Sequence, residues 1–113
     1  MNQNAVDQIE LNIREAREIT DMGEALSRLE KNPDFQKVIS QRYLKDEAVR
    51  LVHLKAAPNA QHEKIQASIL RDIDAIGALE GFFNSLMAEA AHAQDAITAC
   101  NDELVLMSEE GTE

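Results

Sequence analysis

A heptad pattern of apolar residues runs without interruption from His62 to Met107, and it constrains the fold more than any other feature of the sequence. Two series of positions spaced by seven residues hold Ile, Leu, Phe, Ala, Cys or Met, and only His62 and Asp72 depart from this composition. Such spacing is typical of a helix that packs along other helices. Because no proline intervenes, the pattern predicts one helix of about 45–50 residues, roughly 70 Å long. A chain of 113 residues without tryptophan and with few glycines is therefore expected to be an elongated all-α protein.

Two shorter helices are expected before the long one. From Gln3 to Lys31 the apolar residues recur at steps of three and four, which places them on one helical stripe. Asn32-Pro33-Asp34 starts a second helix, because Asn caps well and Pro suits the first helical position. Ala57-Pro58-Asn59 ends it, with Asn59 available to cap the next helix. The expected organisation is a single helical domain of residues 1–113, with helices at about 3–31, 33–56 and 59–108 and an acidic tail at 109–113.

The arrangement of the three helices stays open between two topologies. The first two helices together match the length of the third, so they could form one kinked arm antiparallel to it, a helical hairpin bent at Asn32-Pro33. Alternatively, the first helix folds back to make a three-helix bundle with an overhanging end. The second helix is expected to be sandwiched, because at α-helical spacing Phe35 and Ile39 lie on one side and Leu44 and Leu51 on the other.

The long helix is predicted to mediate self-association. Its e and g positions lack the alternating charges of a two-stranded zipper, so the apolar face is wide and suits a bundle or a ring of copies. Asp72, a polar residue in a d position, is expected to set the register or to form an ion pair with Arg71 or with a cation of the second helix. The expected oligomer interface consists of Ile69, Ile76, Leu79, Phe83, Leu86, Ile97 and Leu104.

Glycines indicate two further features of these helices. The apolar stripe of the first helix slips in phase just before Gly23, which predicts overwinding or a weak spot near Asp21 to Glu24. In the long helix, Gly77 and Gly81 stand four residues apart within a strip of small side chains. These two glycines are expected to allow close packing of another helix.

Charge is divided unevenly along the sequence. Residues 28–71 hold nine basic and five acidic side chains, whereas residues 72–113 hold ten acidic and no basic ones. Carboxylates near the C-terminus of a helix oppose its dipole, so this half of the long helix either stays solvated or meets a basic surface. One such surface is the second helix of a neighbouring copy, which carries Lys37, Arg42, Lys45, Arg50 and Lys55. The net charge of −10 argues against nucleic acid or an anionic membrane as a partner.

The sequence offers little support for catalysis. Glu89 and His92 match the Glu-x-x-His element of di-iron bundles, but such a site needs two of these elements and only one is found. There is no Gly-rich phosphate loop, nucleophile elbow or catalytic triad. The single cysteine, Cys100, leaves no internal disulfide. We therefore expect a non-enzymatic protein without a metal or other cofactor.

The expected location is intracellular. Met1 to Leu11 has neither a basic n-region nor an apolar h-region, and no stretch approaches the length of a membrane span. A lone cysteine in a buried heptad position also fits a reducing compartment.

The stretch Asn32-Pro-Asp-Phe-Gln-Lys-Val-Ile, followed by Tyr43-Leu44 and Glu47-Ala-Val-Arg-Leu51, resembles a segment of small acidic helical proteins encoded among the virion-structure genes of tailed double-stranded DNA bacteriophages. The resemblance implies a non-enzymatic part in building or completing the particle, at the capsid, scaffold or portal. It also implies a location in the host cytoplasm or in the virion, and it brings no catalytic residue with it.

Two functional hypotheses follow. The first is a helical assembly protein that forms homo-oligomers and docks its acidic half on a basic surface of a larger protein complex. The second is a regulatory binder or chaperone that holds a client between its helical arms, as prefoldin-like hairpins do. Self-association through the long helix favours the first hypothesis, whereas a monomer whose heptad face is covered by its own first two helices favours the second.

Overall fold

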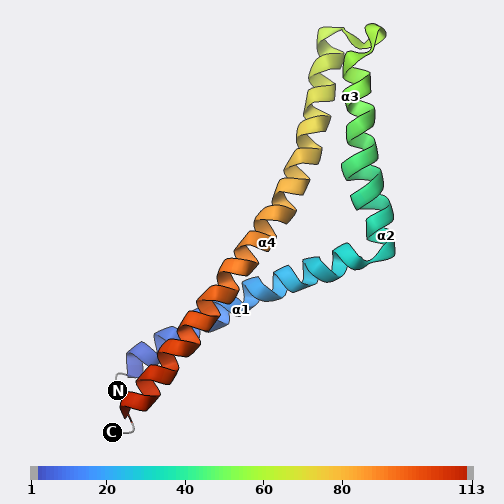
Figure 1. Cartoon of the computed structure of the whole chain (residues 1–113). Coiled ribbons are helices and arrows are strands. Elements are labelled where there is room, and N and C mark those ends of the chain that lie inside the picture. Colours follow the sequence, from blue (N-terminus) through green and yellow to red (C-terminus); the bar gives the residue numbers. More distant parts are fainter. Residues whose placement is uncertain (1–2, 112–113) are drawn as a thin grey trace. The chain divides into compact units, whose positions relative to one another are not determined.

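The computed structural model describes residues 3–111, and these residues form helices joined by short turns, without a strand (Figure 1). The elements in chain order are α1 (Gln3–Lys31), α2 (Pro33–Phe35), the π-helix η1 (Gln36–Glu47), α3 (Ala48–Ala56), the 3-10 turn η2 (Pro58–Ala60) and α4 (Glu63–Gly111). The all-α fold with one long helix is confirmed, since α4 contains 49 residues.

The N-cap predicted at Asn32 is present. Its side-chain oxygen accepts hydrogen bonds from the backbone N–H of Asp34 at 2.9 Å and of Phe35 at 3.2 Å. These bonds satisfy donors that have no partner within the first turn of a helix. Pro33 occupies the first helical position, where an N–H is not needed. Since α1 ends at Lys31, the first helix boundary lies where the sequence predicts it.

The long helix begins and ends later than predicted. Asn59 lies inside η2 and does not cap α4. The imidazole Nδ1 of His62 takes that role instead, because it accepts a hydrogen bond from the backbone N–H of Lys64 at 3.1 Å. At the other end α4 continues to Gly111, so residues 109–111 are helical where an acidic tail was expected. Residues 112 and 113 of that tail lie outside the described part of the chain.

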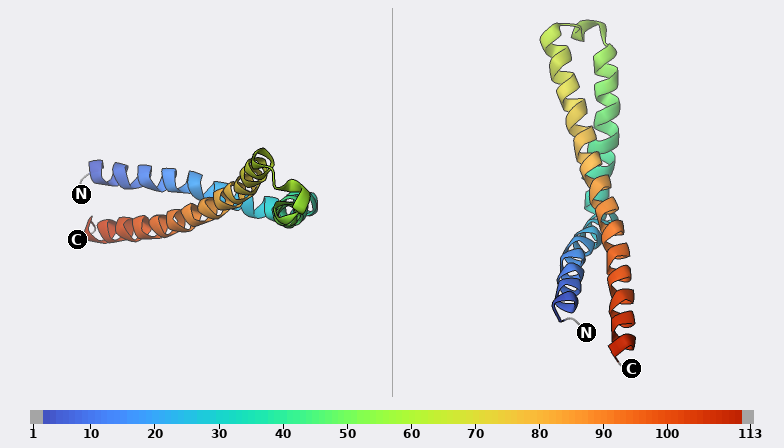
Figure 2. Two further views of the ribbon diagram at one scale, coloured as in Figure 1. Left: turned by 90° about the horizontal axis from the view of Figure 1, so that it is seen from above. Right: turned by 90° about the vertical axis from the view of Figure 1, so that its left-hand side faces the viewer.

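The chain forms two compact units, each of which contains one part of α4. Unit 1 comprises Met1–Leu26 and Ser85–Glu113, and unit 2 comprises Ser27–Asn84. In unit 1, α1 runs antiparallel to the C-terminal half of α4 (Figures 1 and 2). In unit 2, η1 and α3 run antiparallel to the N-terminal half of α4. Each unit is thus a pair of helices, as in the hairpin topology, and not three helices side by side.

Unit 1 is held together by small side chains at the contact between α1 and α4. Ala16 packs with Ala93 and Ile97 in its buried core. Gly23 lies so close to Ala90 that a Cβ added at position 23 would overlap the Cβ of that alanine. Helix α1 passes through Gly23 without a break, so this glycine marks the closest approach of the two helices and not the weak spot expected from the sequence.

Gly77 and Gly81 do not make the predicted close contact within the chain. Both are exposed, and no neighbouring group of the described residues lies within 4 Å of the place where a Cβ would be. A helix packed on this strip would have to come from a second chain.

Unit 2 is organised around Leu51 of α3, whose side chain is only 1% exposed. Leu51 forms a buried cluster with Ala60 of η2 and with Ile69 and Ile76 of α4. Half-buried side chains complete this cluster, among them Tyr43, Leu44, Ala48, Leu54, Ala57 and Ile73. The core of unit 2 therefore joins α3 directly to the first half of α4.

The π-helical winding of η1 explains why the second helix is not sandwiched. In a π-helix the backbone bonds to a residue five positions away, so residues four and five apart share a face. The side chains of Gln41 and Asp46, five residues apart, hydrogen-bond to each other at 2.8 Å. The half-buried apolar residues that follow this spacing are Phe35, Ile39, Leu44 and Ala48. They therefore lie on one face, whereas Val38 and Val49 remain 55% and 56% exposed, and the prediction of two covered sides is wrong.

The contact at Gly23 predicts opposite effects of alanine at two glycines. Gly23→Ala should destabilise the protein, because overpacking against Ala90 costs about 1–3 kcal/mol and exceeds the gain in helix propensity of about 1 kcal/mol. Gly77→Ala, in open space, should raise the melting temperature. Thermal unfolding followed by circular dichroism measures both, and equal shifts for the two variants would contradict the close contact.

The burial of Leu51 predicts a large difference between neighbouring residues of α3. Leu51→Ala should lower the free energy of unfolding by about 2–5 kcal/mol, because it leaves a cavity in the core of unit 2. Val52→Ala should change it by less than about 0.5 kcal/mol, since that side chain is 60% exposed. Urea unfolding of both variants tests the orientation of α3, and similar losses would mean that the helix is turned differently.

Candidate functional site

The heptad residues predicted to join copies of the chain are covered by its own helices. Three of them are buried, namely Ile69, Ile76 and Ile97, and four are half-buried, namely Leu79, Phe83, Leu86 and Leu104. The predicted interface concerns contacts between copies, which a single chain does not contain. Within the chain these side chains pack between α4 and the helices beside it, α1, η1 and α3. These helices would have to separate from α4 before its heptad residues could contact a second copy.

The two phenylalanines of α4 illustrate this division between inner and outer faces. The ring of Phe83 meets the ring of Phe35 at a centroid distance of 5.9 Å and a tilt of 58°. That geometry is favourable for aromatic pairs and helps to hold α2 against α4. The ring of Phe82 lies 6.1 Å from that of Phe83, and Phe82 is 59% exposed. The residue available for a partner is therefore Phe82, which lies outside the a and d positions.

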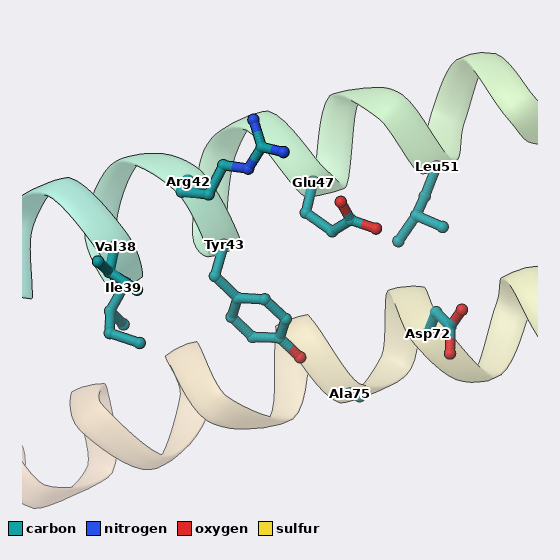
Figure 3. Close-up of a pocket in the computed structure, with 8 residues that line it drawn as sticks. All are labelled: Val38, Ile39, Arg42, Tyr43, Glu47, Leu51, Asp72 and Ala75. Atoms are coloured by element: carbon teal, nitrogen blue, oxygen red, sulfur yellow. The ribbon is translucent and has the colours of Figure 1, made fainter.

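A groove with a volume of about 430 Å³ opens in unit 2 between η1, the start of α3, and α4 (Figure 3). Figure 3 shows the ring of Tyr43 crossing from η1 toward α4, with Asp72 and Ala75 on the opposite wall. The residues that line it are Val38, Ile39, Arg42, Tyr43, Glu47, Leu51, Asp72 and Ala75. Its walls are thus mainly apolar, with a small number of charged groups along the rim.

Glu47, which lines this groove, is paired with a cation outside the lining. Arg50 forms an ion pair with Glu47, and its Nε donates to both carboxylate oxygens at 3.1 Å. This hydrogen bond lowers the pKa of the Glu47 carboxyl below its usual value, and the charges of Arg50 and Arg42 add to the effect. The same hydrogen bond and the charge of Glu47 raise the pKa of Arg50, with a smaller contribution from Asp72. This pair acts as a structural contact and not as an acid and a base.

Asp72 takes a position that only partly matches the prediction for it. It is exposed and lies close enough to Arg50 for its charge to favour the protonated guanidinium. Among the described residues it has no direct ion pair, either with Arg71 or with a cation of the second helix. Its role in register between copies stays a prediction.

A second groove, with a volume of about 580 Å³, lies in unit 1 between α1 and α4. Glu89 and His92, the pair singled out in the sequence, line it together with Glu15 and Cys100. In residues 3–111 no group of three or more His, Cys, Asp and Glu side chains is placed to hold a metal ion. The floor of the groove is formed by Ala16, Ala93 and Ala96, so small apolar side chains dominate its chemistry.

Exposed apolar side chains are the surface feature that the heptad analysis did not find. Among the described residues, thirteen large hydrophobic side chains are exposed: Leu11, Ile19, Met22, Leu29, Val38, Val49, Val52, Ile65, Leu70, Phe82, Met87, Val105 and Leu106. Three pairs among them stand within three residues of each other, one on α1, one on α3 and one near the end of α4. Because the pairs on α3 and α4 do not belong to the heptad stripe, periodicity alone does not single them out.

The division of charge coincides with the two structural units. The sequence of unit 1 contains thirteen Asp and Glu residues against two Arg residues. The sequence of unit 2 contains eight acidic against nine basic residues. Unit 1 is therefore strongly acidic, whereas the acidic and basic side chains of unit 2 nearly balance.

Comparison of the chain with models of protein families, with curated proteins and with solved structures finds no match. Within residues 3–111, no helix combines the length and the apolar character needed to cross a membrane. Function is therefore inferred from the surfaces of the chain itself.

The ion pair beside the unit 2 groove predicts a change in titration. Arg50→Gln should raise the pKa of Glu47, because the hydrogen bond that favours its carboxylate is lost. A folded-state pKa below the unfolded value contributes stability at higher pH, and this contribution is lost as the pH falls through the folded-state pKa.

Carboxyl carbon NMR titration measures this pKa in the wild type and in the variant. Lys55→Gln is the matched control, since it removes a cation about two helical turns away from Glu47. An unchanged Glu47 titration in Arg50→Gln would contradict the ion pair.

Proposed function

We propose that this protein is a non-enzymatic helical assembly protein, which associates with copies of itself and docks on a larger protein complex. The observation that carries the proposal is the balance between buried and exposed apolar side chains. Ten hydrophobic residues of the described chain are buried, and three of these are alanines, whereas thirteen large hydrophobic residues are exposed. A chain that leaves more large hydrophobic side chains exposed than it buries gains apolar burial when it packs against a partner.

The charge distribution supports a protein partner of basic character for unit 1. Its helices carry a large excess of carboxylates, which repel one another and are relieved by a surface rich in Lys and Arg. Nucleic acid is a poor partner for such a surface, because both are anionic. The two grooves contribute packing surface to this role, since aliphatic and alanine side chains make up much of their walls.

The resemblance to helical proteins encoded among the virion-structure genes of tailed phages supports the phage particle as the larger complex on which this protein acts. The resembling stretch corresponds to the capped start of the second helix, η1 and the beginning of α3. In that setting the protein acts in the host cytoplasm on a capsid, scaffold or portal, and it is carried into the virion if it stays bound. The assembly role itself does not depend on this setting.

The alternative function is a regulatory binder or a chaperone of the prefoldin-like helical-hairpin type. Two observations favour it: the chain's own helices cover the heptad stripe of α4, and a shallow groove of about 310 Å³ in unit 1 has an almost entirely apolar lining. Ile19 and Met22 of α1 and Leu86 of α4 form this groove and could hold an apolar client segment. Such a protein would act as a monomer or dimer and would not need to form larger assemblies.

Size-exclusion chromatography with light scattering over a wide range of protein concentration separates the two functions. An assembly protein should show a mass that rises with concentration to species larger than a dimer, and high salt should weaken them because charges contribute to the contacts. A monomer at every concentration that suppresses the aggregation of an unfolded client would contradict self-assembly and support the chaperone.

A further inference from the structure

We propose that the outer face of α3 is a docking surface for the acidic end of α4 from a second copy, so that copies join head to tail. The α3 face consists of Lys45, near the end of η1, and of Val49, Val52 and Lys55 of α3. The α4 end consists of Asp102, Glu103, Val105 and Leu106. This inference rests on the proposed function and names the two surfaces through which self-association takes place.

The α3 face combines apolar area with positive charge. Val49 and Val52 are three residues apart, are 56% and 60% exposed, and lie outside the face that carries the buried Leu51. Lys45 and Lys55 are exposed on either side of them. Among the described residues neither lysine forms an ion pair. The centre of the face is therefore apolar, and its two ends are cationic.

Of the two nearby carboxylates only Glu47 is paired with a cation, and neither carboxylate forms an ion pair with Lys45 or Lys55. Asp46 accepts a hydrogen bond from the side chain of Gln41 at 2.8 Å, and Glu47 forms its ion pair with Arg50. Both anions are thus engaged within their own helix. The two lysines remain able to bind carboxylates of a partner.

The end of α4 has the complementary composition. Val105 and Leu106 are 55% and 59% exposed, although the neighbouring heptad residue Leu104 is half-buried. Asp102 and Glu103 precede Leu106 by four and three residues, and Glu110 follows it by four, so carboxylates flank this leucine along the helix. An apolar centre with anionic ends matches the α3 face in both respects.

The helix dipole adds to the attraction. The C-terminus of a helix carries partial negative charge, so the carboxylates there are destabilised unless cations approach. No Lys or Arg follows Arg71 in the sequence, and the only cations in unit 1 are Arg14 and Arg17. Most Lys and Arg residues lie in unit 2, so unit 2 of another copy is the main source of cations for these carboxylates.

The docking mode fixes the kind of assembly. The two surfaces differ from each other, so each copy keeps one free face of each kind after it has bound a neighbour. Contacts of this kind produce rings when the rotation between copies closes and open filaments when it does not. A two-fold dimer would pair these surfaces only if each copy docked its α4 end on the α3 face of the other at the same time.

Charge reversal on each surface tests the proposal. The basic-face variant carries Lys45→Glu and Lys55→Glu, and the acidic-end variant carries Asp102→Lys and Glu103→Lys. All four side chains are exposed, so both variants should keep the helicity of the wild type. Each variant alone should be monomeric by light scattering, with self-association weakened by more than about tenfold.

A one-to-one mixture of the two variants should restore assembly. The intact α3 face of the acidic-end variant matches the intact α4 end of the basic-face variant, and the two reversed surfaces are again opposite in charge. A control with Lys31→Glu and Lys64→Glu, which reverses two exposed cations elsewhere in unit 2, should assemble like the wild type.

The outcomes separate this inference from the proposed function. Wild-type assembly that persists in both charge-reversed variants would overturn the head-to-tail contact and leave self-association intact. Loss of assembly in the control as well would show an effect of overall charge, and it would also overturn the contact. A monomeric wild type at every concentration would overturn both.

Discussion

The structure depends on covering the apolar stripe of α4, a single helix of 49 residues. One short helix cannot reach along such a stripe, and an uncovered stripe would leave the helix with little tertiary packing to stabilise it. The chain supplies two partners in succession: α1 packs on the C-terminal half of α4 in unit 1, and η1 with α3 packs on its N-terminal half in unit 2. Each pair buries few residues, and a single side chain, Leu51, is fully enclosed.

Two local devices make this pairing possible. In unit 1, Gly23 lets α1 approach Ala90 closely, so small side chains form the contact. In unit 2, the wider turn of η1 brings apolar residues spaced by four and five onto the face toward α4. The face left outside then carries exposed valines and lysines. The same winding that covers the stripe therefore also creates the surface that we assign to a second copy.

The sequence predicts the helices better than their partners. The α1 boundary, the Asn32 cap and the length of α4 follow from local chemistry, since caps and periodicity act within a few residues. A heptad stripe predicts that a helix is covered, but it does not distinguish cover by the same chain from cover by another copy. The sequence therefore predicts an interface between copies at Ile69 and Ile76, whereas the structure buries both within unit 2. For residues 33–56 α-helical spacing predicts two covered sides and gives no sign of the π-helix. It therefore does not predict the exposed face that forms the candidate docking surface.

The apolar stripe of α4 is covered by helices of the same molecule. Isotope-filtered methyl NOE spectra of a one-to-one mixture of labelled and unlabelled protein test it most directly, with Ala16 and Ile97 as the reporter pair. The account predicts an NOE between these methyl groups within labelled molecules and none between labelled and unlabelled ones. An NOE found only between different molecules would contradict it, because the stripe would then join separate chains.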